Sequence, residues 1–283
     1  MRRNKKKMKL ATTAVNLGDE MFPLGSLAEP IFQTSTFGFR NTAELMKYLK
    51  GEKRLYFYTR YSNPTTEMVE RKMAALEGGE AALATSSGMA AISTALLTLV
   101  STGEEMISTF PVYGGTFRLF MNLFPRLGIK VHFVDVDAVE KAVDFINPKT
   151  RVLFIETPTN PNLRLVDLKK TSKLAKKYRL VTMADNTFAT PFNQKPLEYG
   201  IDISIHSATK YLAGHSDLIA GIIVGRKSFV SRSVEVMKLL GGCLDPLGSF
   251  LFARGLKTFP LRVEKQNHNA SKIAHYFSKH PKI

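Results

Sequence analysis

The sequence contains a single cysteine, Cys243, and no tryptophan. One thiol cannot form an intrachain disulfide or an all-cysteine metal site, so both kinds of framework are excluded. No apolar run reaches the roughly 20 residues that a membrane span needs, because the longest one, at 88–100, is interrupted by three hydroxyl side chains. No apolar signal-peptide segment follows the basic N-terminus. We therefore expect a cytoplasmic protein without a membrane partner.

Apolar residues make up 44% of the 283-residue chain, and charged residues make up 23%. A chain of about 300 residues buries roughly three quarters of its unfolded surface, and this one has enough apolar material to form such a core. The composition therefore excludes an intrinsically disordered protein. The length predicts either one large domain or two ordinary ones.

Positive charge is in clear excess, with a formal net charge of +16. Six basic residues fall within the first ten positions. A second basic group, between 169 and 177, follows the spacing of a solvated helix face. No zinc-finger spacing, aromatic RNA-binding motif or recognition helix accompanies these residues. We therefore expect no nucleic-acid partner, although the charge alone keeps that class open as an alternative.

Turn-forming residues and weak periodicity over 10–62 predict an extended arm with one short helix at 42–49. Asn63-Pro64 then begins a helix, because Asn is a good N-cap and Pro is favoured at the first helical position. Gly78-Gly79 ends that helix. Strands are expected at 81–85, 106–110, 130–134, 152–156, 180–184, 203–206 and 219–224, and further helices at 89–100, 114–124, 167–178, 231–240, 247–257 and 261–279.

Short strands that alternate with helices predict βαβ units, and hence an α/β fold. The sheet should be mainly parallel, buried on both faces and flanked by helices. In such sheets, ligands bind beyond the carboxyl ends of the strands. The residues that follow each strand are therefore the candidates for chemistry.

Ser87-Gly88-Met89 follows the first predicted strand and opens a helix, whose free N–H groups and positive dipole end suit a phosphate. A serine N-cap with a glycine turn explains the same residues, and no Gly-x-Gly-x-x-Gly motif or P-loop lysine is present. Asp185 follows a later strand. It is either a turn aspartate or a counter-charge for a ligand cation, such as a protonated pyridine nitrogen.

Ser207, Thr209 and Lys210 follow the strand at 203–206. Two hydroxyls beside a lysine fit phosphate binding next to an amine nucleophile, since a partly desolvated lysine has a lowered pKa and can form a Schiff base. The alternative is a solvated surface lysine. Tyr113 opens a helix after another strand, and is either a core ring or an aromatic platform for a flat cofactor.

Two further groups are less specific. The aromatic and basic run Tyr56–Tyr61, with Arg60 inside it, suggests an interface or an anion contact on the arm. His215 and Asp217 lie close together in sequence, but two residues in one loop do not define a metal site. We therefore expect no metal.

Six short motifs follow one another along the chain: Tyr58–Thr65 (YTRYSNPT), Ser87–Ala90 (SGMA), Tyr113–Thr116 (YGGT), Glu156–Pro161 (ETPTNP), Ala184–Thr187 (ADNT) and Ser207–Tyr211 (SATKY). In this order they resemble the Cys/Met-metabolism family of pyridoxal-phosphate (PLP) enzymes. That family contains cystathionine γ-synthases, cystathionine γ-lyases, methionine γ-lyases and O-acylhomoserine sulfhydrylases. The resemblance runs from about residue 10 to the end, and it is most specific at Ser204–Tyr211.

The resemblance implies the fold-type I, aminotransferase-like architecture, with a mainly parallel sheet of the seven-stranded type. Lys210 would carry PLP as a Schiff base and act as the general base, and Asp185 would pair with the ring nitrogen. Tyr113 would stack on the ring and act as the acid for the leaving group. Asn160 matches a position near the ring and the substrate carboxylate.

Phosphate binding is implied for a further set of residues. The matching positions are Gly88 and Met89 through their N–H groups, Ser207 and Thr209 through their hydroxyls, and Tyr58 and Arg60 from the arm of a neighbouring subunit. Arm exchange of this kind implies a homo-oligomer, either a dimer or a tetramer.

The implied reaction is γ-elimination or γ-replacement on a sulfur-containing or O-acylated amino acid derived from homoserine. A lyase acting on cystathionine or methionine is the first expectation. A γ-synthase or an O-acylhomoserine sulfhydrylase is the alternative, because all these enzymes share the motifs above. Methionine γ-lyases of the best-known type have Cys where this chain has Gly115, so strict methionine specificity is not expected.

The resemblance also divides the chain. It implies an arm at 1–62, a PLP-binding large domain at 63–261 and the start of a C-terminal domain at 262–283. Family members continue into a C-terminal domain with the arginine that binds the substrate carboxylate, so we expect this chain to be truncated. A chain that binds PLP and dimerises without turnover is the alternative from another functional class.

Overall fold

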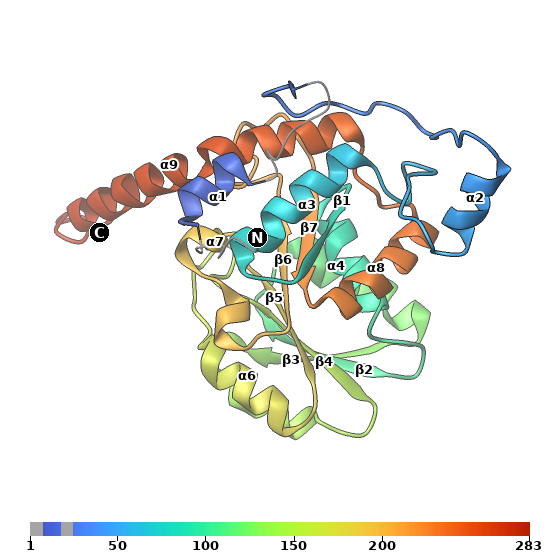
Figure 1. Cartoon of the computed structure of the whole chain (residues 1–283). Coiled ribbons are helices and arrows are strands. Elements are labelled where there is room, and N and C mark those ends of the chain that lie inside the picture. Colours follow the sequence, from blue (N-terminus) through green and yellow to red (C-terminus); the bar gives the residue numbers. More distant parts are fainter. Residues whose placement is uncertain (1–7, 18–24) are drawn as a thin grey trace.

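A seven-stranded sheet forms the centre of the computed structural model, which describes residues 8–17 and 25–283 (Figure 1). The strands are β1 (Ala81–Thr85), β2 (Glu105–Phe110), β3 (Lys130–Asp135), β4 (Thr150–Glu156), β5 (Val181–Asp185), β6 (Ile203–Ser207) and β7 (Gly221–Gly225). Their order is β1-β7-β6-β5-β4-β2-β3. Strand β7 is antiparallel to β1 and β6, and the other pairs are parallel. The predicted α/β class and mainly parallel sheet are confirmed.

Helical segments connect the strands and cover the sheet. The α-helices are α1 (Leu10–Asn16), α2 (Thr42–Leu49), α3 (Pro64–Glu77), α4 (Gly88–Leu97), α5 (Gly114–Arg118), α6 (Leu168–Lys177), α7 (Thr190–Asn193), α8 (Lys227–Leu240) and α9 (Pro246–Phe277). A π-helical turn, η2 (Leu119–Leu123), extends α5. The described ranges also contain the 3-10 segments η3 (Pro125–Leu127), η4 (Val136–Phe145) and η5 (Pro196–Tyr199).

The central strands are buried on both faces, because successive side chains enter different clusters. On β4, Val152 and Phe154 pack into the cluster that α4, α8 and η2 cover. Leu153 and Ile155 point the other way, into the cluster under α6 and η4. At the far end of the sheet, Ile222 of β7 joins the cluster under α1, α3 and α9. Continuous apolar runs are what two-sided burial requires.

Local signals set the ends of helix α3. The side chain of Asn63 accepts a hydrogen bond from Thr65 N (2.9 Å), and Pro64 is the first helical residue. Gly78 ends the helix in the left-handed region, at φ 79°, where glycine has no Cβ to clash. Both ends agree with the sequence prediction.

Two predictions about the ends of the chain are wrong. Residues 10–62 contain a second helix, α1, which the low periodicity concealed; its Ala14 is fully buried against α3 and α9. The predicted break near 257–261 does not exist, because α9 continues through Pro260. Leu256, Phe259 and Val263 lie on one buried stripe of this helix, whose packing outweighs the one hydrogen bond that proline cannot make.

Beyond Val263 the residues of α9 are exposed, and this half of the helix extends away from the body (Figure 1). It crosses the predicted domain boundary between 261 and 262, so that division stays a prediction. None of the helices in the described ranges, α9 included, combines the length and apolar character of a membrane span. The basic tip at 1–7 and residues 18–24 of the predicted arm lie outside those ranges.

A buried ion pair attaches the N-terminal segment to the body. Lys72 Nζ of α3 lies 2.6 Å from Glu29 Oε1, and both side chains are almost fully buried. The same Nζ donates to the carbonyl of Val15, just before the end of α1. A buried charge without its partner is far more costly than an exposed one, so this lysine holds α1 and the start of the arm on α3.

We predict that Lys72→Met lowers the free energy of unfolding by about 3–5 kcal/mol, because the Glu29 carboxylate then stays buried without its partner. Lys53→Met is the matched control, since the Lys53–Glu44 pair is largely exposed on the lysine side and such pairs contribute about 1 kcal/mol or less. Urea unfolding of the cofactor-free variants measures both. Equal losses in the two variants would contradict the prediction.

Candidate active site

A cavity of about 310 Å³ lies beyond the carboxyl ends of β1, β2, β4, β5 and β6. This is the edge at which α/β sheets bind ligands, and the volume suits a small cofactor. Eight of the ten residues singled out from the sequence line it: Gly88, Met89, Tyr113, Asn160, Asp185, Ser207, Thr209 and Lys210. The two arm residues, Tyr58 and Arg60, do not.

One end of the cavity is suited to an anion. Gly88 and Met89 are the first two residues of α4, whose N–H groups have no carbonyl partner within the helix and lie at its positive end. Ser87 is the N-cap and accepts from Ala90 N (3.0 Å). A Cβ on Gly88 would lie 2.7 Å from Ser207 Cβ, so the turn reaches the hydroxyl of β6 only because residue 88 is glycine.

Asp185 ends β5 with its carboxylate in the cavity and is 8% exposed. Its Oδ1 accepts from both the N–H (3.0 Å) and the hydroxyl (2.6 Å) of Thr187, and that hydroxyl accepts from Ser207 N (2.8 Å). Burial raises the pKa of Asp185, while the Thr187 bonds and the nearby His206 act in the opposite direction. A cation bound beside Asp185 would relieve this desolvation.

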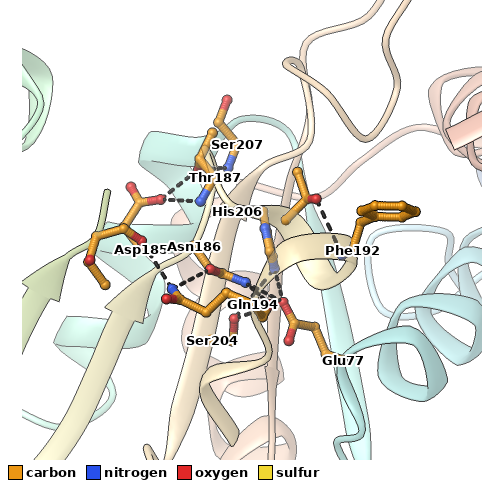
Figure 2. A network of polar contacts seen from close by, with 11 residues as sticks. Glu77, Asp185, Asn186, Thr187, Phe192, Gln194, Ser204, His206 and Ser207 are labelled. Atoms are coloured by element: carbon orange, nitrogen blue, oxygen red, sulfur yellow. Dashed lines mark hydrogen bonds and ion pairs between the residues drawn. The ribbon is translucent and has the colours of Figure 1, made fainter. Parts of the chain in front are cut away.

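A buried polar network supports Asp185 from beneath (Figure 2). At its centre, Glu77 Oε1 accepts from Asn186 Nδ2 (3.0 Å), from Ser204 Oγ (3.1 Å) and from His206 Nε2. Asn186 also exchanges hydrogen bonds with Gln194. The network therefore ties the end of α3 to the residues next to Asp185 and Ser207.

Glu77 was missed by the sequence reasoning. The available signal was an acid at an inward-facing position of α3, four residues after the buried Met73. Such a residue must be paired, because an isolated buried carboxylate is very costly. The partners could not be identified in advance, since they lie in β6 or directly after β5, more than a hundred residues away.

Glu156 is a second carboxylate that the sequence reasoning left without a role. It ends β4, directly beside Asp185 in the register of the two strands, and lines the cavity. Burial and the charge of Asp185 raise the pKa of Glu156 to about 7, whereas hydrogen bonds from the N–H groups of Tyr113 and Asn160 act to lower it. Its signal was the same as that of Asp185, an acid at the end of a buried strand.

Lys210 lies in the turn after β6, so its side chain lines the cavity from the same end as Ser207 and Thr209. The Thr209 hydroxyl is bonded to the backbone of Ala220 at the start of the neighbouring segment. Tyr113 is half exposed at the N-cap of α5. A Cβ on Gly115 would lie 2.5 Å from Tyr113 Cε1, so this glycine provides the space that the tyrosine ring occupies.

The arm residues form a separate group. The Arg60 guanidinium donates to the carbonyl of Lys238 at the end of α8, and it lies 5.4 and 5.1 Å from the ring centres of Tyr58 and Tyr61. Their part in phosphate binding stays a prediction. Within residues 8–17 and 25–283, no cluster of three or more His, Cys, Asp or Glu side chains could hold a metal ion.

The donor set fits a phosphorylated, aldehyde-bearing pyridine. Helix α4 offers N–H groups to a phosphate, buried Asp185 offers a negative charge to a ring nitrogen, and Lys210 offers an amine to the aldehyde. These three features line one cavity and require no rearrangement of the strands.

Comparison with known proteins gives one consistent result. The family model described as "Cys/Met metabolism PLP-dependent enzyme" matches residues 11–283. An L-methionine gamma-lyase of Fusobacterium nucleatum subsp. polymorphum is 44% identical over 281 residues, 98% of this chain and 71% of the relative. A cystathionine gamma-lyase of Bacillus subtilis is 42% identical over 267 residues, 94% of this chain and 68% of the relative.

A similar solved structure is that of a putative O-acetylhomoserine (thiol)-lyase from Campylobacter jejuni, which contains a pyridoxyl-lysine monophosphate. Its TM-score is 0.92 at 28% identity, over 97% of this chain and 76% of that chain. These matches agree with the fold and with the cofactor implied by the motifs.

We predict that, relative to a Glu156→Gln variant, the cofactor-free protein loses stability as the pH rises. Unfolded Glu156 titrates near its ordinary value of 4.5 and folded Glu156 near 7. Between these values the folded state binds more protons, so the stabilisation is present below the unfolded pKa and is lost as the pH rises through the folded one. Urea unfolding between pH of about 5 and about 8 measures the slope. Identical slopes in both proteins would contradict the prediction.

Proposed function

This chain belongs to the Cys/Met metabolism family of PLP-dependent enzymes, and we propose that it cleaves the Cγ–S bond of a γ-thioether amino acid such as methionine or cystathionine. The enzyme class, a PLP-dependent carbon–sulfur lyase, follows from the family and from the lyases among its relatives. One observation carries the proposal: the N-terminus of α4, the buried carboxylate of Asp185 and Lys210 all line the same cavity.

PLP, when bound, supplies an aldehyde that forms a Schiff base with amines and a protonated ring that withdraws electrons. We assign the phosphate to the N–H groups of Gly88 and Met89, with the hydroxyls of Ser207 and Thr209 beside them. The Asp185 carboxylate would accept a hydrogen bond from the protonated ring nitrogen, and Thr187 keeps that carboxylate oriented by donating two hydrogen bonds to it. Tyr113, which lines the same cavity, would stack on the ring.

Proton transfer is assigned to two side chains. Lys210 Nζ, which lines the cavity, removes the proton from Cα and then moves protons at Cβ as the general base. Tyr113 donates its phenolic proton to the departing sulfur as the Cγ–S bond breaks. The thiol leaves with that proton. Water then supplies the oxygen of the 2-oxo acid, and the nitrogen leaves as ammonia, which balances the reaction.

Substrate choice depends on the space around Tyr113. Because Gly115 has no side chain, the ring of Tyr113 and the sulfur of Met89 approach the position of its absent Cβ to 2.5 and 3.1 Å. Nothing at 115 therefore adds a thiol or a methyl group to the cavity. We propose that both methionine and cystathionine are accepted, with Asn160 near the substrate carboxylate.

The full chain loaded with PLP tests this proposal. We expect L-methionine or L-cystathionine to release a 2-oxo acid, ammonia and a thiol, and the visible absorbance to shift on substrate addition. Lys210→Ala should lose this turnover and the Schiff-base absorbance. Lys272→Ala, on the exposed half of α9, is the matched control and should keep both.

Two outcomes would contradict the proposal. Thioether formation from O-acetylhomoserine and a thiol, without 2-oxo acid, would assign a γ-replacement enzyme instead. A Schiff-base band that no amino acid perturbs would assign a chain that binds the cofactor without turnover.

We also propose a homo-oligomer in which the arm completes the neighbouring site. Helix α2 has no buried residue, and its Tyr48 clusters with Phe39 and Phe57 of the flanking arm. The arm follows a course away from the sheet (Figure 1), so its aromatic side chains suit a second copy of the chain.

The division into an arm at 1–62, a large domain at 63–261 and the start of another domain belongs to this proposal. So does a cytoplasmic location, which the single cysteine supports.

Complementation tests the arm exchange. Arg60→Ala and Lys210→Ala are each expected to abolish most activity. Mixed dimers, purified through two different tags after co-expression, contain one complete site of two and should regain about half of the parent activity per dimer. Inactive mixed dimers would show that Arg60 acts within its own subunit, and a fully active Arg60→Ala homodimer would show that Arg60 has no part in the site.

A further inference from the structure

Glu156 lies between two loops of the cavity, and its side chain contacts the backbone of both. We propose that Glu156 is a positioning residue. Its carboxylate fixes the main chain at Tyr113 and at Asn160, so that their side chains are oriented toward the bound cofactor and substrate. This inference rests on the roles that the proposed function gives to Tyr113 and Asn160. It adds a residue that binds neither ligand directly.

The Glu156 carboxylate binds the backbone of Tyr113 and of Asn160 at the same time, an arrangement that we call the clamp. Glu156 Oε2 accepts from Tyr113 N at 2.7 Å, and Glu156 Oε1 accepts from Asn160 N at 2.9 Å. A carboxylate is planar and rigid, so the two N–H groups are held at a set separation. A neutral side chain of the same size offers only one such acceptor, because its second terminal atom is a donor.

Other constraints on Tyr113 are few. The residue is 49% exposed, and as the N-cap of α5 it has no capping hydrogen bond from its own side chain. The ring therefore depends on the backbone for its position. Asn160 lies in the loop after β4, outside any strand or helix. A misplacement of about 1 Å in a reacting group can cost about 100-fold in rate, so such residues need an anchor.

Glu156 itself is well anchored. It is the last residue of β4, is 5% exposed, and its backbone N–H donates to Thr109 Oγ1 of β2 at 3.3 Å. The strand register sets it beside Asp185, so the anchor of the two loops and the carboxylate assigned to the ring nitrogen belong to one rigid unit. The two main-chain donors also stabilise a negative charge that burial and Asp185 oppose.

The test removes one of the two acceptors of Glu156 without changing the size of the side chain. In the PLP-loaded enzyme, Glu156→Gln should lower kcat about 10- to 100-fold and change the visible circular dichroism per bound cofactor. Hydrogen exchange, followed by mass spectrometry on peptides that contain Tyr113 or Asn160, should be faster in at least one of them. Glu104→Gln, a surface carboxylate bonded to Arg151, is the matched control and should leave all three unchanged.

The outcomes separate the clamp from the proposed function. A Glu156→Gln enzyme with a lower unfolding midpoint but parental kcat, KM and circular dichroism would overturn the positioning role and leave lyase activity standing. Faster exchange with unchanged turnover would overturn it equally. If Glu156→Gln does not fold, Glu156→Asp takes its place in the same assays. Hydrogen exchange of the parent protein gives a second test, since rapid exchange at the amides of both Tyr113 and Asn160 in the folded parent would refute the clamp.

Discussion

Two carboxylates, Glu156 and Asp185, end neighbouring strands and lie side by side at the cavity, both largely buried. Burial opposes both charges, and repulsion from Asp185 adds to it at Glu156. Backbone N–H groups of two loops hold the Glu156 carboxylate, and Thr187, two residues after Asp185, holds the other. The two negative charges therefore require hydrogen-bond donors from the protein and a cation bound beside them. A protonated pyridine beside Asp185 and a phosphate at the start of α4 complete that charge distribution, which is why PLP suits this site.

The sheet brings these groups together in two ways. Parallel pairing sets the carboxyl ends of β2, β4, β5 and β6 along one edge. Antiparallel β7 separates β1 from β6, and its first residue, Gly221, faces the end of both neighbours. A Cβ there would lie 2.1 Å from the carbonyl oxygen of Ser87. The absence of a side chain at Gly221 lets the turn before α4 approach Ser207 across the intervening strand.

Much of this was predictable from the sequence, because it depends on local signals. Apolar runs identified every strand of the described ranges to within two residues, and Asn63 and Gly78 marked the ends of α3. Strand ends also led to Asp185 and Lys210. The features that were missed depend on distant contacts: the burial of α1 against α9, the packing that carries α9 through Pro260, and the partners of Glu77 and Glu156. A single sequence shows an acid near a strand or helix end, but it does not show which backbone that acid will bind.

The site divides its functions between rigid and irregular segments. The groups assigned to hold the cofactor come from the start of α4 and from the ends of β5 and β6, whose positions the buried network of Glu77 and His206 reinforces (Figure 2). Two of the side chains assigned to the reaction and to the substrate, those of Tyr113 and Asn160, start from loops. Loops allow a side chain to approach a substrate, but they give it little positional precision. A carboxylate that starts from a rigid strand and binds both loops through their main chain resolves that conflict, and Glu156 is the residue whose contacts meet this requirement.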